Sequence, residues 1–199
     1  FTMAQDRQPH LTSTNNIPPD SLVKRADALL KQHPDSALLI YDRAAESFSN
    51  DKNWTQWFEC INKMRDIHKT ARNYQASINH MLEAAQTALV QIGKTDTITA
   101  KVLMRLGTAY DIAGKYDSAL MVYQQAVSVF ELHQIEDATV ATLQKNIGNI
   151  YGRRMDYQQA TDHLSEALRI RLELNDQTVA ARIYNDLGIV YQNWKDYPK

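Results

Sequence analysis

Gly93-Lys94-Thr95 is the segment that comes closest to a catalytic motif, because it matches the end of a phosphate-binding loop. Such a loop cradles phosphate oxygens with backbone N–H groups, follows a strand, and needs a glycine five residues before Gly93. Ala88 stands at that position, and no strand pattern precedes the segment. We therefore exclude a phosphate-binding loop.

The histidines and the cysteine lack the spacings that metal binding or nucleophilic catalysis needs. Cys60 and His68 are eight residues apart, about 12 Å along a helix and too far for a catalytic pair. A single cysteine excludes an internal disulfide, and its apolar neighbours predict a half-buried, inert thiol. Zinc-binding histidines on one helix are typically four residues apart, and none of the six has such a partner: His10, His33, His68, His80, His133 and His163. We expect no catalytic site, metal or cofactor.

The composition points away from two classes of partner. The chain has 199 residues, of which 44% are apolar and 23% charged, as in an ordinary globular protein. Its 22 basic and 23 acidic residues are well mixed and give a net charge of −1. We therefore expect neither nucleic-acid binding nor a basic membrane-surface patch. No apolar run approaches the roughly 18–20 residues that cross a bilayer.

A tyrosine and a glycine recur with a nearly constant period. The tyrosine steps are 42, 41 and 40 residues, between Tyr74, Tyr116, Tyr157 and Tyr197. Nine residues before the last three of these stand Gly107, Gly148 and Gly188, and Pro34 lies 40 residues before the first. A fixed period of this size indicates a repeat array, in which each unit buries its apolar face against its neighbours.

Each unit has the pattern of two amphipathic helices joined by a short turn. In the unit from 100 to 131, apolar residues recur every three to four positions on both sides of a break at Gly114-Lys115. Asp156 precedes Tyr157 in the next unit, where a carboxylate can cap the second helix. The sequence predicts a lead-in over 1–18 and, over 19–199, four helical hairpins plus one further helix.

These residues resemble the tetratricopeptide repeat (TPR) family in its long-period form, as in kinesin light chain and in arrays at the N-terminus of bacterial regulatory and CHAT-domain proteins. The family pattern has an apolar-small pair and an aromatic residue in the first helix, and small residues in the second. The matching residues are Leu106-Gly107, Tyr110, Ala119, Tyr123 and Ala126, then Ile147-Gly148, Tyr151, Ala160 and Ala167, then Leu187-Gly188 and Tyr191. The resemblance implies an all-α fold, a right-handed superhelical array of antiparallel helical hairpins. We expect Gly107 to face Ala119 across its hairpin, and Tyr110 and Tyr123 to fill the space between that hairpin and its neighbours.

The resemblance also implies a partner-binding site in a concave groove lined by the first helix of each hairpin. Asn146 matches a position whose amide holds an extended peptide, whereas Arg105 and Asp186 occupy that position in the neighbouring units. Lys145 with Asn149 resembles a pair that clamps a C-terminal carboxylate, which Asp186 would repel. The predicted groove residues are Lys101, Arg105, Thr108, Thr142, Lys145, Asn146, Asn149, Arg182, Asn185 and Asp186.

The predicted function is non-catalytic: a protein-interaction or sensory module that binds a protein or peptide, as the N-terminal part of a larger regulatory protein. The alternatives are a structural adaptor complete in itself, and the regulatory array of a CHAT protease or sensor kinase whose catalytic domain lies beyond residue 199. The end of the chain interrupts a repeat, which predicts truncation there. Phe1 to Ala4 fit either a signal-peptide remnant or a processing boundary. The expected location is accordingly the cytoplasm or, after export, the periplasm.

Overall fold

The structure, a computed structural model, describes residues 17–196. Within these residues every regular element is helical and there is no strand, which confirms the all-α prediction. The predicted lead-in up to residue 16, with Phe1 to Ala4, and the last repeating tyrosine, Tyr197, lie outside the described residues. The helices are α1 (Pro19–Leu29), α2 (Pro34–Asn50), α3 (Trp54–Thr70), α4 (Tyr74–Thr87), α5 (Thr97–Ile112), α6 (Tyr116–Leu132), α7 (Ala138–Arg153), α8 (Tyr157–Glu173) and α9 (Gln177–Asp196), with a π-helix, η1 (Ala88–Ile92), after α4.

The first of two compact units ends at Met64 and contains α1, α2 and most of α3. Helix α1 packs against α2, and the fully buried Tyr41 of α2 donates a hydrogen bond to Asp27 of α1 at 2.5 Å. Lys63 of α3 donates to the same carboxylate at 2.9 Å. The hydrogen bond from Tyr41 lowers the pKa of Asp27 most, and the one from Lys63 lowers it further. Through these two hydrogen bonds, one carboxylate joins the three helices of this unit.

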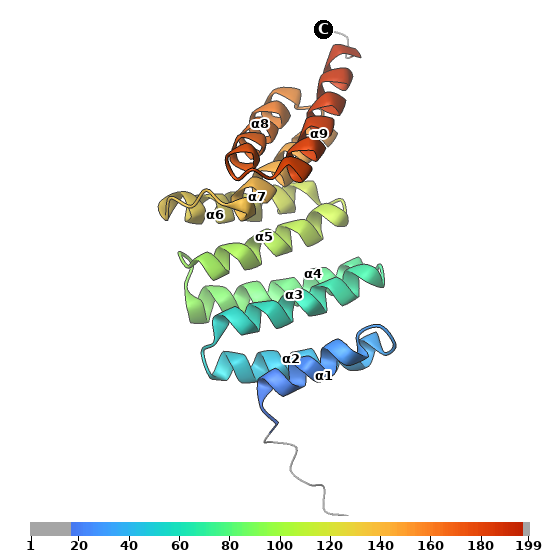
Figure 1. The fold of residues 1–199 in the computed structure, drawn as a ribbon, viewed down its shortest axis with the longest axis vertical. Helices are drawn as coiled ribbons and strands as arrows, with labels where there is room; N and C mark the ends of the chain where they lie inside the picture. Colours follow the sequence, from blue (N-terminus) through green and yellow to red (C-terminus); the bar gives the residue numbers. More distant parts are fainter. Residues whose placement is uncertain (1–16, 197–199) are drawn as a thin grey trace, which may run out of the picture. The chain divides into compact units, whose positions relative to one another are not determined.

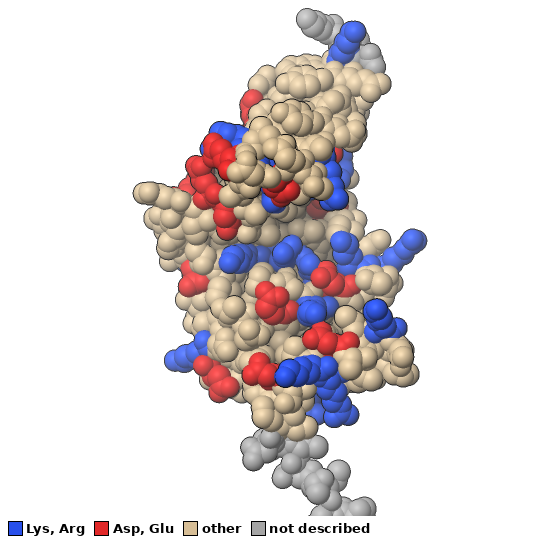
Figure 2. All heavy atoms as spheres, in the orientation of Figure 1, with Lys and Arg blue, Asp and Glu red and all other residues tan. Residues whose placement is uncertain are grey.

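The second unit begins at Arg65 and contains the end of α3 and α4 to α9. Helices α5 and α6 form one hairpin and α7 and α8 the next, and α9 packs against α8 (Figure 1). Figure 2, drawn from the same direction, shows Lys and Arg side chains gathered over α5. Gly93 ends η1 with a φ of +117°, and α4 and η1 precede it in place of the strand that a phosphate-binding loop requires.

The repeating residue marks the start of the second helix of each hairpin. The first residues of α2, α4, α6 and α8 are Pro34, Tyr74, Tyr116 and Tyr157. The residue before it can cap the helix, because a short polar side chain accepts the free N–H groups of the first turn. Asp156 accepts from the Gln159 N–H at 3.3 Å, as predicted, and Asn73 accepts from the Ala76 N–H at 3.1 Å.

The hairpin turns share a left-handed residue two positions before the tyrosine. It is Arg72 (φ 55°) before α4, Gly114 (φ 74°) before α6 and Met155 (φ 64°) before α8. A side chain with a β-carbon costs roughly 1–2 kcal/mol in this conformation, and glycine adopts it freely. The glycine in the α5–α6 turn is therefore the least strained of the three choices.

Met155→Gly is expected to stabilise the chain by roughly 0.5–1 kcal/mol. The gain is the relief of left-handed strain less the larger entropy that glycine has in the unfolded state. Met155 is 61% exposed, so little packing is lost. Urea unfolding followed by circular dichroism measures the change, with Met155→Ala as the matched control. An alanine variant as stable as the glycine variant would show that the turn is not strained.

The glycines of the first helices allow the two helices of a hairpin to approach closely. A β-carbon added to Gly148 would lie 2.8 Å from Leu164 Cγ and 3.0 Å from the Ala160 carbonyl oxygen. At Gly107 the three nearest atoms all belong to the ring of Tyr123. The first glycine thus makes room for a buried aromatic ring.

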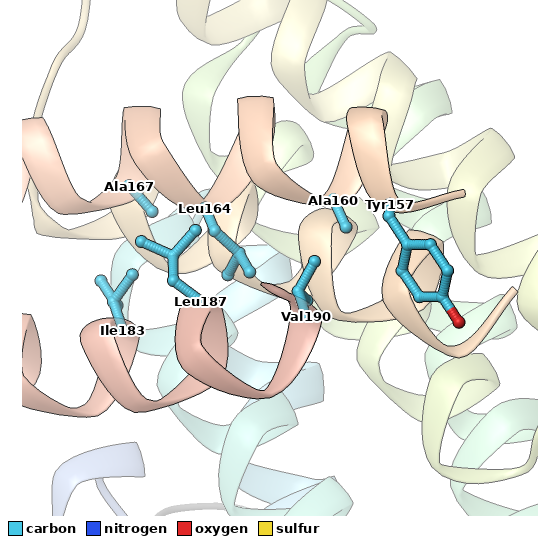
Figure 3. Packing of buried hydrophobic residues seen from close by; sticks show 7 residues of the cluster. All are labelled: Tyr157, Ala160, Leu164, Ala167, Ile183, Leu187 and Val190. Carbon is cyan, nitrogen blue, oxygen red and sulfur yellow. The ribbon is translucent and has the colours of Figure 1, made fainter. Parts of the chain in front are cut away.

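The last hairpin and α9 share a core that shows how neighbouring repeats are joined. Figure 3 shows four residues of α8 pointing toward three of α9. Leu164 and Ile183 have no exposed surface, so apolar burial between α8 and α9 stabilises α9 against the preceding hairpin. The seven residues are Tyr157, Ala160, Leu164, Ala167, Ile183, Leu187 and Val190.

Candidate functional site

The ten predicted groove residues belong to α5, α7 and α9, the first helices of successive units. Helix α5 contacts α7, and α7 contacts α9, so the three helices are adjacent in order. We call the surface formed by the ten residues the first-helix face. Arg182 and Asn185 are exposed and the other eight are half-buried: Lys101, Arg105, Thr108, Thr142, Lys145, Asn146, Asn149 and Asp186.

Two of the ten residues are joined through a tyrosine of a second helix. The Asn146 amide donates to the hydroxyl of Tyr123 at 3.4 Å, and this hydroxyl donates to Thr108 Oγ1 at 3.2 Å. Burial raises the pKa of Tyr123 to about 12, so the hydroxyl keeps its proton at neutral pH. This chain of hydrogen bonds fixes Asn146 of α7 against the α5–α6 hairpin, and it uses part of the amide that a peptide would need.

Asn149 and Asp186 form a contact between α7 and α9. The Asn149 amide donates to Asp186 Oδ2 at 3.3 Å. The amide nitrogen that resembled part of a C-terminal carboxylate clamp therefore already faces a carboxylate of the chain itself. A ligand carboxylate at this position would have to compete with Asp186 for the same donor.

Thr142 is held by an arginine that the repeat pattern did not reveal. Arg171, near the end of α8, is 9% exposed and donates to Thr142 Oγ1 and to the Ala138 carbonyl, both at 2.7 Å. It also forms an ion pair with Asp176 at 2.9 Å. Asp176 in turn caps α9 by accepting from the Val179 N–H at 3.2 Å. Thr142 thus takes part in a contact that joins α7, α8 and α9.

Four of the ten residues are available to a ligand. Their side chains form no hydrogen bond or ion pair with any residue between 17 and 196: Lys101, Lys145, Arg182 and Asn185. Three of these four are cations. The ten residues together carry four positive charges and one negative charge, a net +3, on a chain whose net charge is −1.

A metal site, a membrane-spanning helix and a reactive thiol would each show particular features within residues 17–196. In that part of the chain no three His, Cys, Asp or Glu side chains come together as metal ligands would, and no helix is long and apolar enough to span a bilayer. Cys60 is 2% exposed, more buried than predicted, and burial raises its thiol pKa to about 11. A thiol in this state is a poor nucleophile at neutral pH.

The stacked hairpins, with residues in register every 40–42 positions, define the chain as a helical-repeat array with a polar face along its first helices. The family model for the tetratricopeptide repeat matches residues 66–131 and 139–199. The chain therefore belongs to the TPR family, and its array is a TPR protein-binding module.

Individual relatives are distant in sequence. The Tonsoku-like protein of Drosophila melanogaster is 32% identical over 87 residues, which are 44% of this chain and 6% of that protein's length. Among solved structures, the apo form of RapI has a TM-score of 0.77 at 13% identity and is matched over 93% of this chain and 68% of RapI. The kinesin light chain-like BtubC (BKLC) of P. vanneervenii has a TM-score of 0.66 at 16% identity, over 89% of this chain and 82% of BtubC. These two structures share the fold.

Proposed function

We propose that the first-helix face binds an acidic peptide, or an acidic segment of a partner protein, as the recognition element of a larger regulatory protein. The main support for this proposal is a set of three cations that have no partner among residues 17–196: Lys101, Lys145 and Arg182. Ionised donors form hydrogen bonds to carboxylates that are shorter and stronger than neutral ones. An acidic ligand would satisfy them, whereas a basic ligand would be repelled.

The hydrogen bonds within the face hold two of its amide side chains in place beside the cations. Asn146 and Asn149 are oriented by Tyr123 and Asp186, so their positions are fixed before a ligand arrives. Preorganised polar groups lower the ordering cost of binding. In this proposal the module supplies recognition, and any catalytic activity of the whole protein lies outside residues 19–199.

The proposal predicts which peptides bind and which substitution weakens their binding. A random dodecapeptide display library selected on the 199-residue chain should yield peptides enriched in Asp and Glu. Lys145→Glu should weaken the binding of the selected peptides by about 10-fold or more, because it replaces an attractive charge with a repulsive one. Fluorescence anisotropy with a labelled selected peptide measures the dissociation constant, and thermal unfolding checks that the variant is folded.

Lys115→Glu is the matched control, since it makes the same charge change at an exposed position before α6 that is outside the face. It should leave the affinity within about twofold, the effect of a remote charge screened by salt. Selected peptides without an acidic bias, or an equal loss of affinity in the two variants, would contradict the proposal.

A further inference from the structure

A cavity of about 420 Å³ lies between α6, α7, α8 and the loop that joins α6 to α7. None of the residues of the first-helix face lines it. Its inner surface includes the buried side chains of Val127, Phe130 and Val140. Its outer part carries three carboxylates, those of Glu131, Glu136 and Glu166. The volume lies in the range of pockets that bind ligands, roughly 300–1,000 Å³.

The carboxylates of this cavity already hold one guanidinium group of the chain. Arg169 donates from Nε and Nη2 to Glu166 at 3.0 and 2.6 Å, and from Nη2 to Glu136 at 3.0 Å. Its Nη1 donates to both oxygens of Glu173 at 2.8 and 3.0 Å. These contacts engage all three nitrogens of the guanidinium. Two of the three carboxylates of the cavity, Glu136 and Glu166, are thus paired with a cation of the chain itself, and Glu131 is not.

The negative charge exceeds what Arg169 can neutralise. The three carboxylates of the cavity and the guanidinium of Arg169 leave a net charge of −2, and Glu131 forms no ion pair within residues 17–196. His163 bonds to Gln144 at the side of the cavity, and burial lowers its pKa, so it stays neutral at pH 7. The cavity therefore combines an apolar interior with unneutralised carboxylates.

We propose that this cavity binds a lysine or arginine side chain presented by a partner polypeptide. The methylene stem would lie on Val127, Phe130 and Val140, and the cationic head would meet Glu131 and Glu136. Lysine and arginine have this division between an apolar stem and a charged head. Charge-assisted hydrogen bonds to carboxylates supply the preference for a cation. The chain then has two recognition sites of opposite charge preference.

A pair of small probes tests the proposal directly. Nα-acetyl-arginine amide carries the stem and the charge, and Nα-acetyl-citrulline amide is its neutral counterpart of nearly the same shape. Titration of the 199-residue chain with the arginine probe should shift the methyl NMR signals of Val127 and Val140, with a dissociation constant in the millimolar range. The citrulline probe should bind about 5- to 10-fold more weakly, since it lacks the charge-assisted contacts.

Two variants with the same change of charge locate the site. Glu131→Gln should reduce the arginine-over-citrulline preference by at least half, whereas Glu83→Gln on α4, away from the cavity, should leave it unchanged. Glu131 is exposed, so the variant is expected to fold, which circular dichroism checks. Equal binding of the two probes, no methyl shift, or an unchanged preference in Glu131→Gln would overturn the proposal. Because the first-helix face is tested with acidic peptides, the two proposals fail independently.

Discussion

Leucine at Gly148 is expected to lower the free energy of unfolding by about 2–3 kcal/mol, whereas leucine at Gly188 should leave it unchanged or raise it slightly. Both glycines occupy the same position of the repeat, nine residues before the tyrosine. Their surroundings differ. Around Gly188 no atom of the described residues lies within 4 Å of an added β-carbon, whereas at Gly148 three atoms lie within 3.1 Å.

The loss at Gly148 arises from atoms that cannot turn away. Two of the three are backbone atoms of α8, the Ala160 oxygen at 3.0 Å and the Leu164 nitrogen at 3.1 Å. A larger side chain therefore has to push α7 away from α8, and overpacking of this kind costs about 1–3 kcal/mol. At Gly188 only the gain in helix propensity over glycine remains, roughly 0.5–1 kcal/mol.

Urea unfolding of the two leucine variants measures the difference, with tryptophan fluorescence as a second probe. Gel filtration checks that an exposed leucine at position 188 does not cause association. A loss at Gly188 as large as that at Gly148 would contradict the explanation, because it would show that position alone, without close contact, makes glycine necessary. Equal stability of both variants would show that the α7–α8 hairpin can relax around the added side chain.

The sequence could predict the features of the fold that depend on local chemistry. The second helices begin at Pro34, Tyr74, Tyr116 and Tyr157, where a turn precedes each helix and a capping side chain precedes two of them, α4 and α8. The neighbour of each glycine was harder to predict, since it depends on how two helices cross. Gly148 does contact Ala160, but the atoms nearest to Gly107 belong to Tyr123.

For the candidate site, the sequence could place residues on the first helices but could not tell which side chains are already engaged. The partners are distant in sequence: Asn146 bonds to a residue 23 positions away, Thr142 to one 29 away and Asn149 to one 37 away. The acid-lined cavity has no periodic signal either, because it is formed by three helices and a loop. Arg171 has no periodic signal either, because the equivalent residue one repeat earlier is Phe130.

Asp176→Ala is expected to lower the free energy of unfolding by about 3 kcal/mol and to open α9 preferentially. Two losses combine. The buried guanidinium of Arg171 would keep only neutral acceptors, Ala138 O and Thr142 Oγ1, and an uncompensated buried charge costs several kcal/mol. The cap on the Val179 N–H would also disappear, at about 1 kcal/mol. The 31% exposure of the Asp176 side chain limits the sum.

Two further variants separate these losses. Asp176→Ser keeps an oxygen that can cap α9 but removes the carboxylate, so its free energy of unfolding should lie between those of the wild type and Asp176→Ala. Arg171→Met removes the buried charge and leaves Asp176 to solvent and to the cap, so it should cost only about 1 kcal/mol. Amide hydrogen exchange along α9, compared with α5, reports local opening. If Asp176→Ala costs no more than Arg171→Met, the carboxylate does not neutralise the guanidinium, and packing alone joins α9 to the preceding hairpin.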